Sequence, residues 1–211
     1  MKKSKAILMA LCAVLLVAAS VMGTLAYLTS TDKVVNTFTV GKVAIKLDEA
    51  KATPDGSLVD GADRVKANEY HLLPGHTYEK DPMVTVLKGS ESSYIKMTVT
   101  FTKAAELDAI FAPNGADMTS IFKGYDPTNW IDKGNTEDTE SNTRTYEFWY
   151  KEAVAAPTAD VKLDALFDKI VVPGTITNTQ LATIEGMTIT VNAYAIQADG
   201  FTDAADAWNH F

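Results

Sequence analysis

The stretch Ser93-Tyr94-Ile95-Lys96-Met97-Thr98-Val99-Thr100-Phe101-Thr102 decides how this chain folds. Its apolar side chains occupy every second position and its polar side chains stand between them. A period of two is typical of a β-strand that buries one face and leaves the other facing solvent. The sequence therefore predicts a half-buried antiparallel strand here, with Ile95, Met97, Val99 and Phe101 directed into the core.

Similar patterns occur on both sides of this stretch. Strands are expected at Val34–Val40, Lys42–Leu47, Met83–Leu87, Arg144–Lys151 and Met187–Ala198. Gly41 lies where the apolar positions change parity, which indicates a bulge or bend. Many short strands joined by turn-rich loops predict a mainly β protein: an antiparallel, jelly-roll-like β-sandwich with short helical insertions.

The sequence predicts fewer helices than strands. Helical spacing predicts short helices at Lys103–Phe111, Thr179–Ile184 and Asp203–Phe211, the last capped by Thr202. The stretch Val161–Val172 is ambiguous, although its apolar residues fit helical spacing. Polar composition predicts loops at Lys51–Ala67 and Gly134–Asn142.

The N-terminus has the pattern of a secretory signal peptide. Three lysines precede an apolar run from Ala6 to Met22, and small residues follow at Thr24 and Ala26. These features predict cleavage between Ala26 and Tyr27. The chain would then consist of a signal peptide (1–26) and a single β-sandwich domain (27–211), secreted and held at the membrane only through an uncleaved signal.

Charge and cysteine content narrow the functional classes. The signal holds three of the 19 basic residues and none of the 27 acidic ones, so residues 27–211 carry a net charge of −11. Such a charge repels nucleic acid, which is therefore not expected as a partner. Cys12 is the only cysteine and lies in the signal, so the mature domain has no disulfide and no thiol nucleophile.

Motifs for catalysis are missing from the sequence. It contains neither a His-Glu-x-x-His helix nor a Gly-x-Ser-x-Gly elbow. His71 and His76 flank a Pro-Gly turn, which leaves a metal pair open as an alternative to two surface histidines. Acidic residues within 55–63 leave calcium open, although their spacing fails the EF-hand pattern. We expect no enzyme activity, no cofactor and no metal.

Aromatic residues raise one more alternative. They could form a carbohydrate-binding face, or half of them could point into the core, because alternate positions of a strand face opposite sides. The residues concerned are Trp130, Tyr146, Phe148, Trp149, Tyr150 and Trp208.

Four segments resemble the TasA/camelysin family of exported proteins from Gram-positive bacteria. They are Gly23-Thr24-Leu25-Ala26-Tyr27, Asn36-Thr37-Phe38-Thr39-Val40-Gly41, Leu73–Pro82 and Gly186–Gln197. The resemblance implies a jelly-roll-like fold, a signal cut by a signal peptidase of the SipW type, and a cell-surface or biofilm-matrix role, with some members forming fibres. One branch carries a metallo-endopeptidase label, which gives the alternative function.

The segment Tyr27–Leu47 suggests how such a protein could assemble. It is rich in β-forming residues and contains no proline. Once the signal is removed, it would be a free N-terminal strand that could complete a neighbour's sheet. It could equally pair within its own sheet. The candidate assembly residues are Val35, Phe38, Val40, Val43, Ile45 and Leu47, and the expected partners are further copies of this chain or other matrix proteins.

The cleavage site gives the first testable prediction. Ala26→Asp should block processing, because signal peptidases require a small residue directly before the cut. Mass spectrometry of secreted protein should give an N-terminus at Tyr27 for the natural chain, whereas the variant should stay with the membrane fraction. Secreted protein that begins elsewhere, or that retains Cys12, would contradict the assignment.

Overall fold

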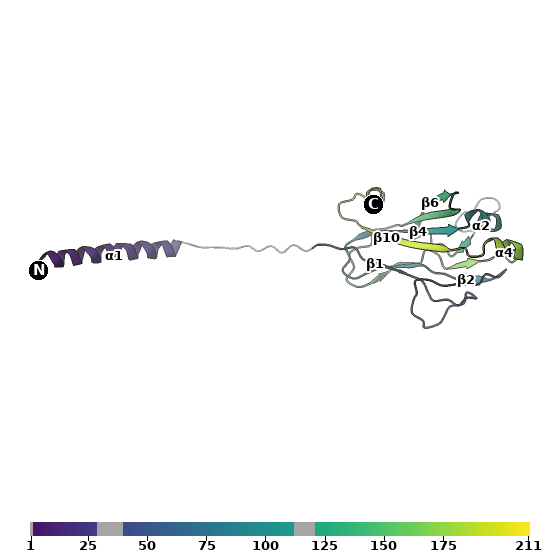
Figure 1. Cartoon of the computed structure of the whole chain (residues 1–211), viewed down its shortest axis with the longest axis horizontal. Helices are drawn as coiled ribbons and strands as arrows, with labels where there is room; N and C mark the ends of the chain where they lie inside the picture. Colours follow the sequence, from purple (N-terminus) through teal and green to yellow (C-terminus); the bar gives the residue numbers. More distant parts are fainter. Residues whose placement is uncertain (1, 29–39, 112–120) are drawn as a thin grey trace. The chain divides into compact units, whose positions relative to one another are not determined.

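The computed structural model describes residues 2–28, 40–111 and 121–211, which belong to two compact units. The first unit contains helix α1 (Lys2–Leu28), and the second, from Gly41 to Phe211, contains the described strands and the other described helices (Figure 1). Within these ranges, no helix combines the length and apolar character needed to cross a membrane.

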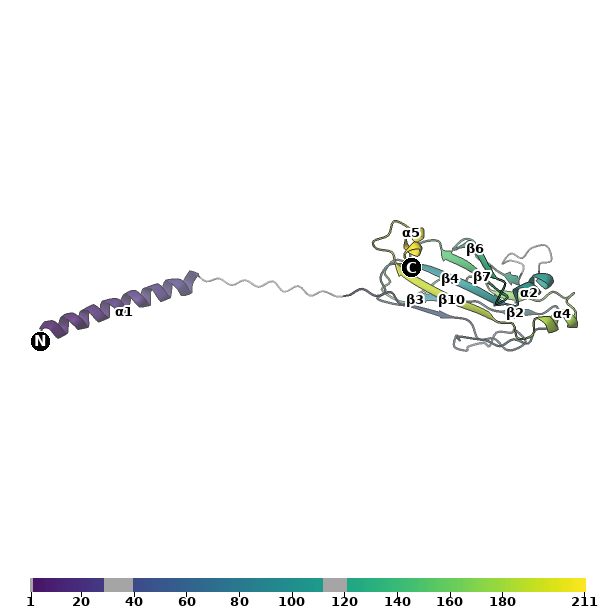
Figure 2. The same ribbon diagram turned by 45° about the horizontal axis from the view of Figure 1, so that its top comes forward.

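A four-stranded antiparallel sheet forms the centre of the second unit (Figure 2). Its order is β10 (Ile189–Gln197), β4 (Ser93–Thr102), β7 (Thr143–Tyr150) and β6 (Trp130–Asp138). β4 therefore has a partner on both sides, and β10 and β6 are the two edges.

Two three-stranded antiparallel sheets complete the β structure. One has the order β1 (Ile45–Asp48), β3 (Met83–Val86) and β8 (Val161–Lys162). The other has the order β2 (Thr77–Glu79), β9 (Lys169–Val171) and β5 (Phe122–Lys123). Short helices lie between strands or at the end: α2 (Ala104–Phe111), α4 (Asn178–Thr183) and α5 (Ala204–Asn209).

The alternation predicted for residues 93–102 is confirmed. Odd-numbered residues of β4 are buried and even-numbered ones are half-buried throughout the strand. Val99 lies opposite Val191 on one side and Tyr146 on the other, so three strands present apolar residues to the same core. That core also contains residues of β2, β3, β5 and β9, which joins the three sheets.

Aromatic rings fill the middle of the core. Phe122 stacks on Phe167 with ring centroids 3.8 Å apart, and Phe101 packs against Phe122 at 5.2 Å. Phe101 also meets Tyr146 edge to face. Such pairs stabilise the fold beyond the area they bury.

The stretch Val161–Val172, whose pattern is ambiguous, is not helical. The chain forms β8, an irregular crossing and β9, with Leu163 and Leu166 donating backbone N–H groups to Val84 and Pro82. Leu163, Leu166, Phe167 and Ile170 are all buried. Their spacing reflects a segment that crosses the core, and such a segment can imitate a helical pattern.

The loop expected at Gly134–Asn142 is also wrong in part. Residues 130–138 form β6, whose side chains beyond Trp130 are exposed. An edge strand with two wet faces needs no apolar alternation, and its backbone hydrogen bonds to β7 hold it in place. The sequence pattern therefore carried no signal for it.

Other expectations agree with the structure. β7, β10, α2 and α4 occupy the predicted stretches, and the mainly β, antiparallel character is confirmed.

The cap predicted for the last helix is wrong by one residue. Asp203 is the N-cap and accepts the N–H of Asp206 at 2.9 Å, while Thr202 donates its own N–H to the Asp206 carboxylate.

The two faces of β4 give a stability prediction. Phe101→Ala should lower the free energy of unfolding by about 3–5 kcal/mol, because the ring is only 2% exposed and its removal leaves a cavity. Thr100→Ala should cost about 0.5–1.5 kcal/mol, the value of its hydrogen bond to Thr145. Urea unfolding measures both, and equal losses would mean that the register is wrong.

Candidate functional site

The predicted cleavage residues Thr24, Ala26 and Tyr27 belong to α1, where the structure describes the backbone but not their side chains. Val35 and Phe38, two of the predicted assembly residues, lie outside the described residues. The structure therefore leaves these five assignments as predictions.

The other predicted assembly residues lie on or before β1. Val40 is 97% exposed, while Val43, Ile45 and Leu47 are half-buried. The strand expected at Lys42–Leu47 is shorter than predicted, because regular pairing begins only at Ile45. Ahead of it, the carbonyls of Lys42 and Ala44 accept hydrogen bonds from the turn after β3.

β1 pairs within its own chain. Ile45 to Asp48 run antiparallel to Val86 to Met83 of β3. Ile45 and Leu47 thus already have a strand partner. β1 is itself an edge strand, because the order of its sheet is β1-β3-β8.

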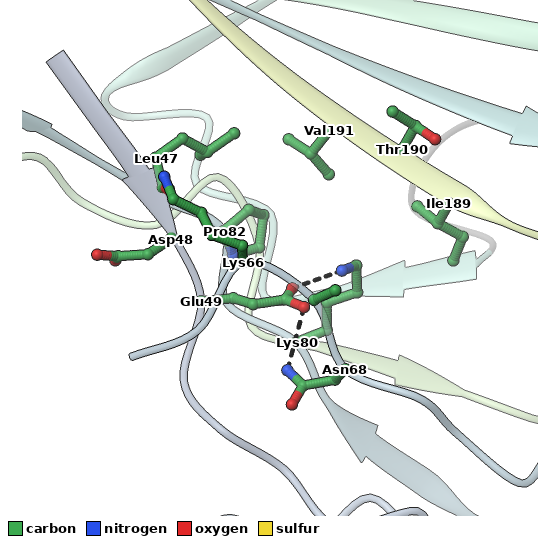
Figure 3. A pocket seen from close by; sticks show the side chains of 11 residues that line it. Leu47, Asp48, Glu49, Lys66, Asn68, Lys80, Pro82, Ile189, Thr190 and Val191 are labelled. Carbon is green, nitrogen blue, oxygen red and sulfur yellow. Dashed lines mark hydrogen bonds and ion pairs between the residues drawn. The ribbon is translucent and has the colours of Figure 1, made fainter. Parts of the chain in front are cut away.

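A groove runs between β1 and β10. Two adjoining pockets, of about 330 and 400 Å³, share Asn68, Lys80 and Ile189 in their walls. Figure 3 shows Leu47 of β1 and Val191 of β10 directed toward each other across the first pocket. We call this continuous hollow the β10 groove.

The apolar wall of the β10 groove is incompletely covered. The residues of β10 on the core side, Ile189, Val191, Ala193 and Ala195, are half-buried. Their neighbours on β4 in the same layer are fully buried. Within the described ranges, β10 has no strand on its second edge. This corner of the core therefore has room for additional covering residues.

Three polar side chains lie at one end of the groove. Lys80 forms an ion pair with Glu49, and both side chains are less than one tenth exposed. Asn68 donates its amide Nδ2 to Glu49 Oε1 at 3.0 Å and to the Ala50 carbonyl at 2.8 Å. The backbone N–H of Ala52 donates to Asn68 Oδ1 at 2.9 Å, which fixes the orientation of the amide.

A second charged network lies beside the first. Arg64 donates Nε to Asp48 Oδ1 at 2.6 Å and Nη1 to Asp81 Oδ2 at 2.8 Å. Lys46 also contacts the Asp48 carboxylate at 2.7 Å. Burial raises the pKa of Asp48, but the hydrogen bonds from Lys46 and Arg64 outweigh it and hold that pKa below its ordinary value.

The histidine pair gains no further ligands from the described chain. His71 and His76 are exposed, and no group of three or more His, Cys, Asp or Glu residues in the described ranges could hold a metal ion. In the candidate calcium loop, Asp55 accepts hydrogen bonds from Thr53 and from the Ser57 N–H. Its carboxylate thus closes a turn.

The candidate carbohydrate face is divided between core and surface. Trp130 and Phe148 are fully buried, and Trp130 donates Nε1 to the Asp164 carbonyl at 3.0 Å. Trp149 lies under the ammonium of Lys133, at 4.2 Å. Trp208 covers the ammonium of Lys96 on the outer face of β4, at 4.6 Å. The aromatic residues therefore form no continuous flat row.

The Glu49, Asn68 and Lys80 cluster was not foreseen from the sequence. Its members come from three segments that follow β1, precede β2 and follow β2. The acidic residues next to Lys80 in the sequence hint at an ion pair for this lysine, but no local motif connects Lys80 with Asn68. The juxtaposition depends on how loop 49–82 folds over the groove.

The pKa of Asp48 gives a prediction on acid stability. A lowered folded-state pKa stabilises the native protein above the ordinary carboxyl pKa, and this contribution is lost as the pH falls through the folded value. Asp48→Asn should therefore cost about 1.5–3 kcal/mol at pH 7, the value of hydrogen bonds to a charged group. The difference in unfolding free energy between this variant and the natural protein should narrow below about pH 4.

Chemical denaturation between about pH 3 and about pH 7 measures this difference. Asp60→Asn removes an exposed carboxylate from the loop that follows β1 and serves as the control. A constant gap at every pH would contradict the role given to the Asp48 charge.

Comparisons with known proteins add no assignment, because no protein-family model, curated protein or solved structure matches this chain.

Proposed function

We propose that this protein is a secreted structural component of the cell surface or biofilm matrix, a fibre subunit that assembles through its N-terminal strand. The observation that carries this proposal is the β10 groove, where an edge strand and a half-exposed apolar wall lie side by side. An unpaired strand edge can accept a further strand through main-chain hydrogen bonds, and adjacent apolar pockets can select its side chains.

The acceptor side of this proposal rests on burial. Leu47, Ile189 and Val191 face the groove and are half-buried. A strand laid along β10 would cover them and would satisfy the backbone groups on its second edge. Each added apolar contact is favoured by about 25 cal/mol for every Å² removed from water.

The donor side rests on the residues ahead of β1. Because β1 pairs with β3, and Lys42 and Ala44 bond to the turn after β3, the donated strand is shortened from the expected Tyr27–Leu47 to residues 27–41. This stretch still contains Val35, Phe38 and Val40, and it contains no proline. Signal cleavage before Tyr27, by a peptidase of the SipW type, would release its N-terminal end and thereby gate assembly.

The remaining features are consistent with a structural role outside the cell. A mature charge of −11 and the absence of cysteine after residue 12 suit a soluble exported domain. The three antiparallel sheets around one core are compatible with the jelly-roll-like sandwich that the family resemblance implies.

The groove gives a prediction on assembly. Val191→Asp should prevent fibre formation by mature protein, because the charge would be buried unpaired beneath the incoming strand. Electron microscopy over time measures the outcome. Asn192→Asp is the matched control, since it puts the same charge at the next position, which is exposed on the opposite face of β10. It should leave fibre formation unchanged.

A synthetic peptide covering residues 27–41 tests the donor. It should bind the protein in calorimetry, raise its melting temperature and cap growing fibres, and Phe38→Asp in the peptide should remove all three effects. Circular dichroism confirms that both protein variants are folded. Strand donation at this groove would be refuted if the Val191 and Asn192 variants formed fibres equally well. It would also be refuted if fibres grew unchanged in the presence of the peptide.

A further inference from the structure

The polar cluster of the β10 groove brings together an amine, a carboxylate and a carboxamide. Figure 3 shows Glu49 between Lys80 and Asn68, with one dashed contact to each. One carboxylate oxygen receives the lysine ammonium and the other receives the asparagine amide. Both donors are thus held on one carboxylate, and a reaction between them would require the lysine side chain to rotate until Nζ reaches the amide carbon.

The amide is held in a fixed orientation. Nδ2 donates to Glu49 and to the Ala50 carbonyl, while Oδ1 accepts the backbone N–H of Ala52. A backbone N–H at the carbonyl oxygen stabilises the negative charge that develops there when a nucleophile adds to the carbon. The carboxylate at Nδ2 stands where a proton has to be delivered to the leaving group.

We propose that Lys80 and Asn68 are joined by an intramolecular isopeptide bond, with Glu49 as the acid–base catalyst. Glu49 takes a proton from the Lys80 ammonium, and the resulting neutral amine attacks Asn68 Cγ. The bond from Cγ to Nδ2 then breaks as Glu49 delivers that proton to Nδ2. The second proton that Nζ loses on becoming an amide leaves with the ammonia as ammonium. One C–N bond forms, one C–N bond breaks and one ammonia leaves, so no oxidant or further reactant is needed.

Burial favours this reaction over a permanent ion pair. Lys80 and Glu49 are each less than a tenth exposed, and a buried ion pair loses much of its attraction to desolvation. Bond formation removes the lysine charge, and the adjoining pocket gives the ammonia a way out. The product would tie residue 68 to residue 80 across the loop that borders the β10 groove.

A second lysine of the same pocket lacks these partners. Lys66 also lines the pocket, but its ammonium donates to the backbone carbonyl of Leu47. No carboxamide shares a carboxylate with it among the described contacts. Lys66 therefore provides a matched control for any nonspecific reaction of lysine.

Intact-mass spectrometry of the purified, denatured natural protein tests the proposal. Its mass should be lower than the sequence mass by one ammonia. Digestion after Glu69 and Glu79 cuts the chain between the two residues, so the fragments that contain Asn68 and Lys80 should stay joined. The deficit should disappear completely in Lys80→Arg, Asn68→Ala and Glu49→Gln, and it should persist in Lys66→Arg. Asn68→Asp should restore the bond with loss of water in place of ammonia.

The natural protein alone can overturn the proposal, whatever the variants do to folding. A full sequence mass in protein that circular dichroism shows to be folded would exclude the bond. An ammonia deficit that remains in Lys80→Arg, or fragments that separate after digestion, would assign the deficit to another asparagine and would equally refute it. Fibre formation is not part of this test, so its result is independent of the assembly proposal.

Discussion

The burial of one face of β4 is the constraint on which the rest of the structure depends. This strand is paired on both sides, and its five odd-numbered residues from Ser93 to Phe101 are at most 2% exposed. A slip of one residue would turn all of them outward. The registers of β7 and β10 follow from it, and apolar side chains of the two smaller sheets pack over the same layer.

The two edges of that sheet differ in a way that bears on function. β6 carries exposed charged and polar side chains and has a register shift between Asp132 and Asn135, both of which discourage pairing with another chain. β10 instead borders a groove with apolar walls. One protected edge and one receptive edge would allow association in a single direction.

Much of the fold was predictable where burial imposes a period. β4, β7 and β10 each have one face on the core, so their apolar residues alternate, and α2 shows helical spacing. β6 gives no such pattern because both of its faces are exposed to solvent. Residues 161–172 stay ambiguous in the sequence because an irregular crossing can bury residues at helical intervals. Of the candidate site, the N-terminal residues came from local motifs. The Glu49, Asn68 and Lys80 cluster could not be predicted, since it joins three separate segments through tertiary contacts alone.

The outer face of β4 has a practical consequence. The ammonium of Lys96, already described beneath Trp208, also lies 5.0 Å from the ring of Phe211, the last residue of the chain. Phe211 is thus a structural contact, and an affinity tag or fluorescent fusion attached to it would compete with ring packing on the central sheet. The exposed turn between β6 and β7, at residues 139–141, is a safer place for a reporter. The fluorescence of Trp208, whose ring lies against the Lys96 ammonium, would report when helix α5 separates from the sheet.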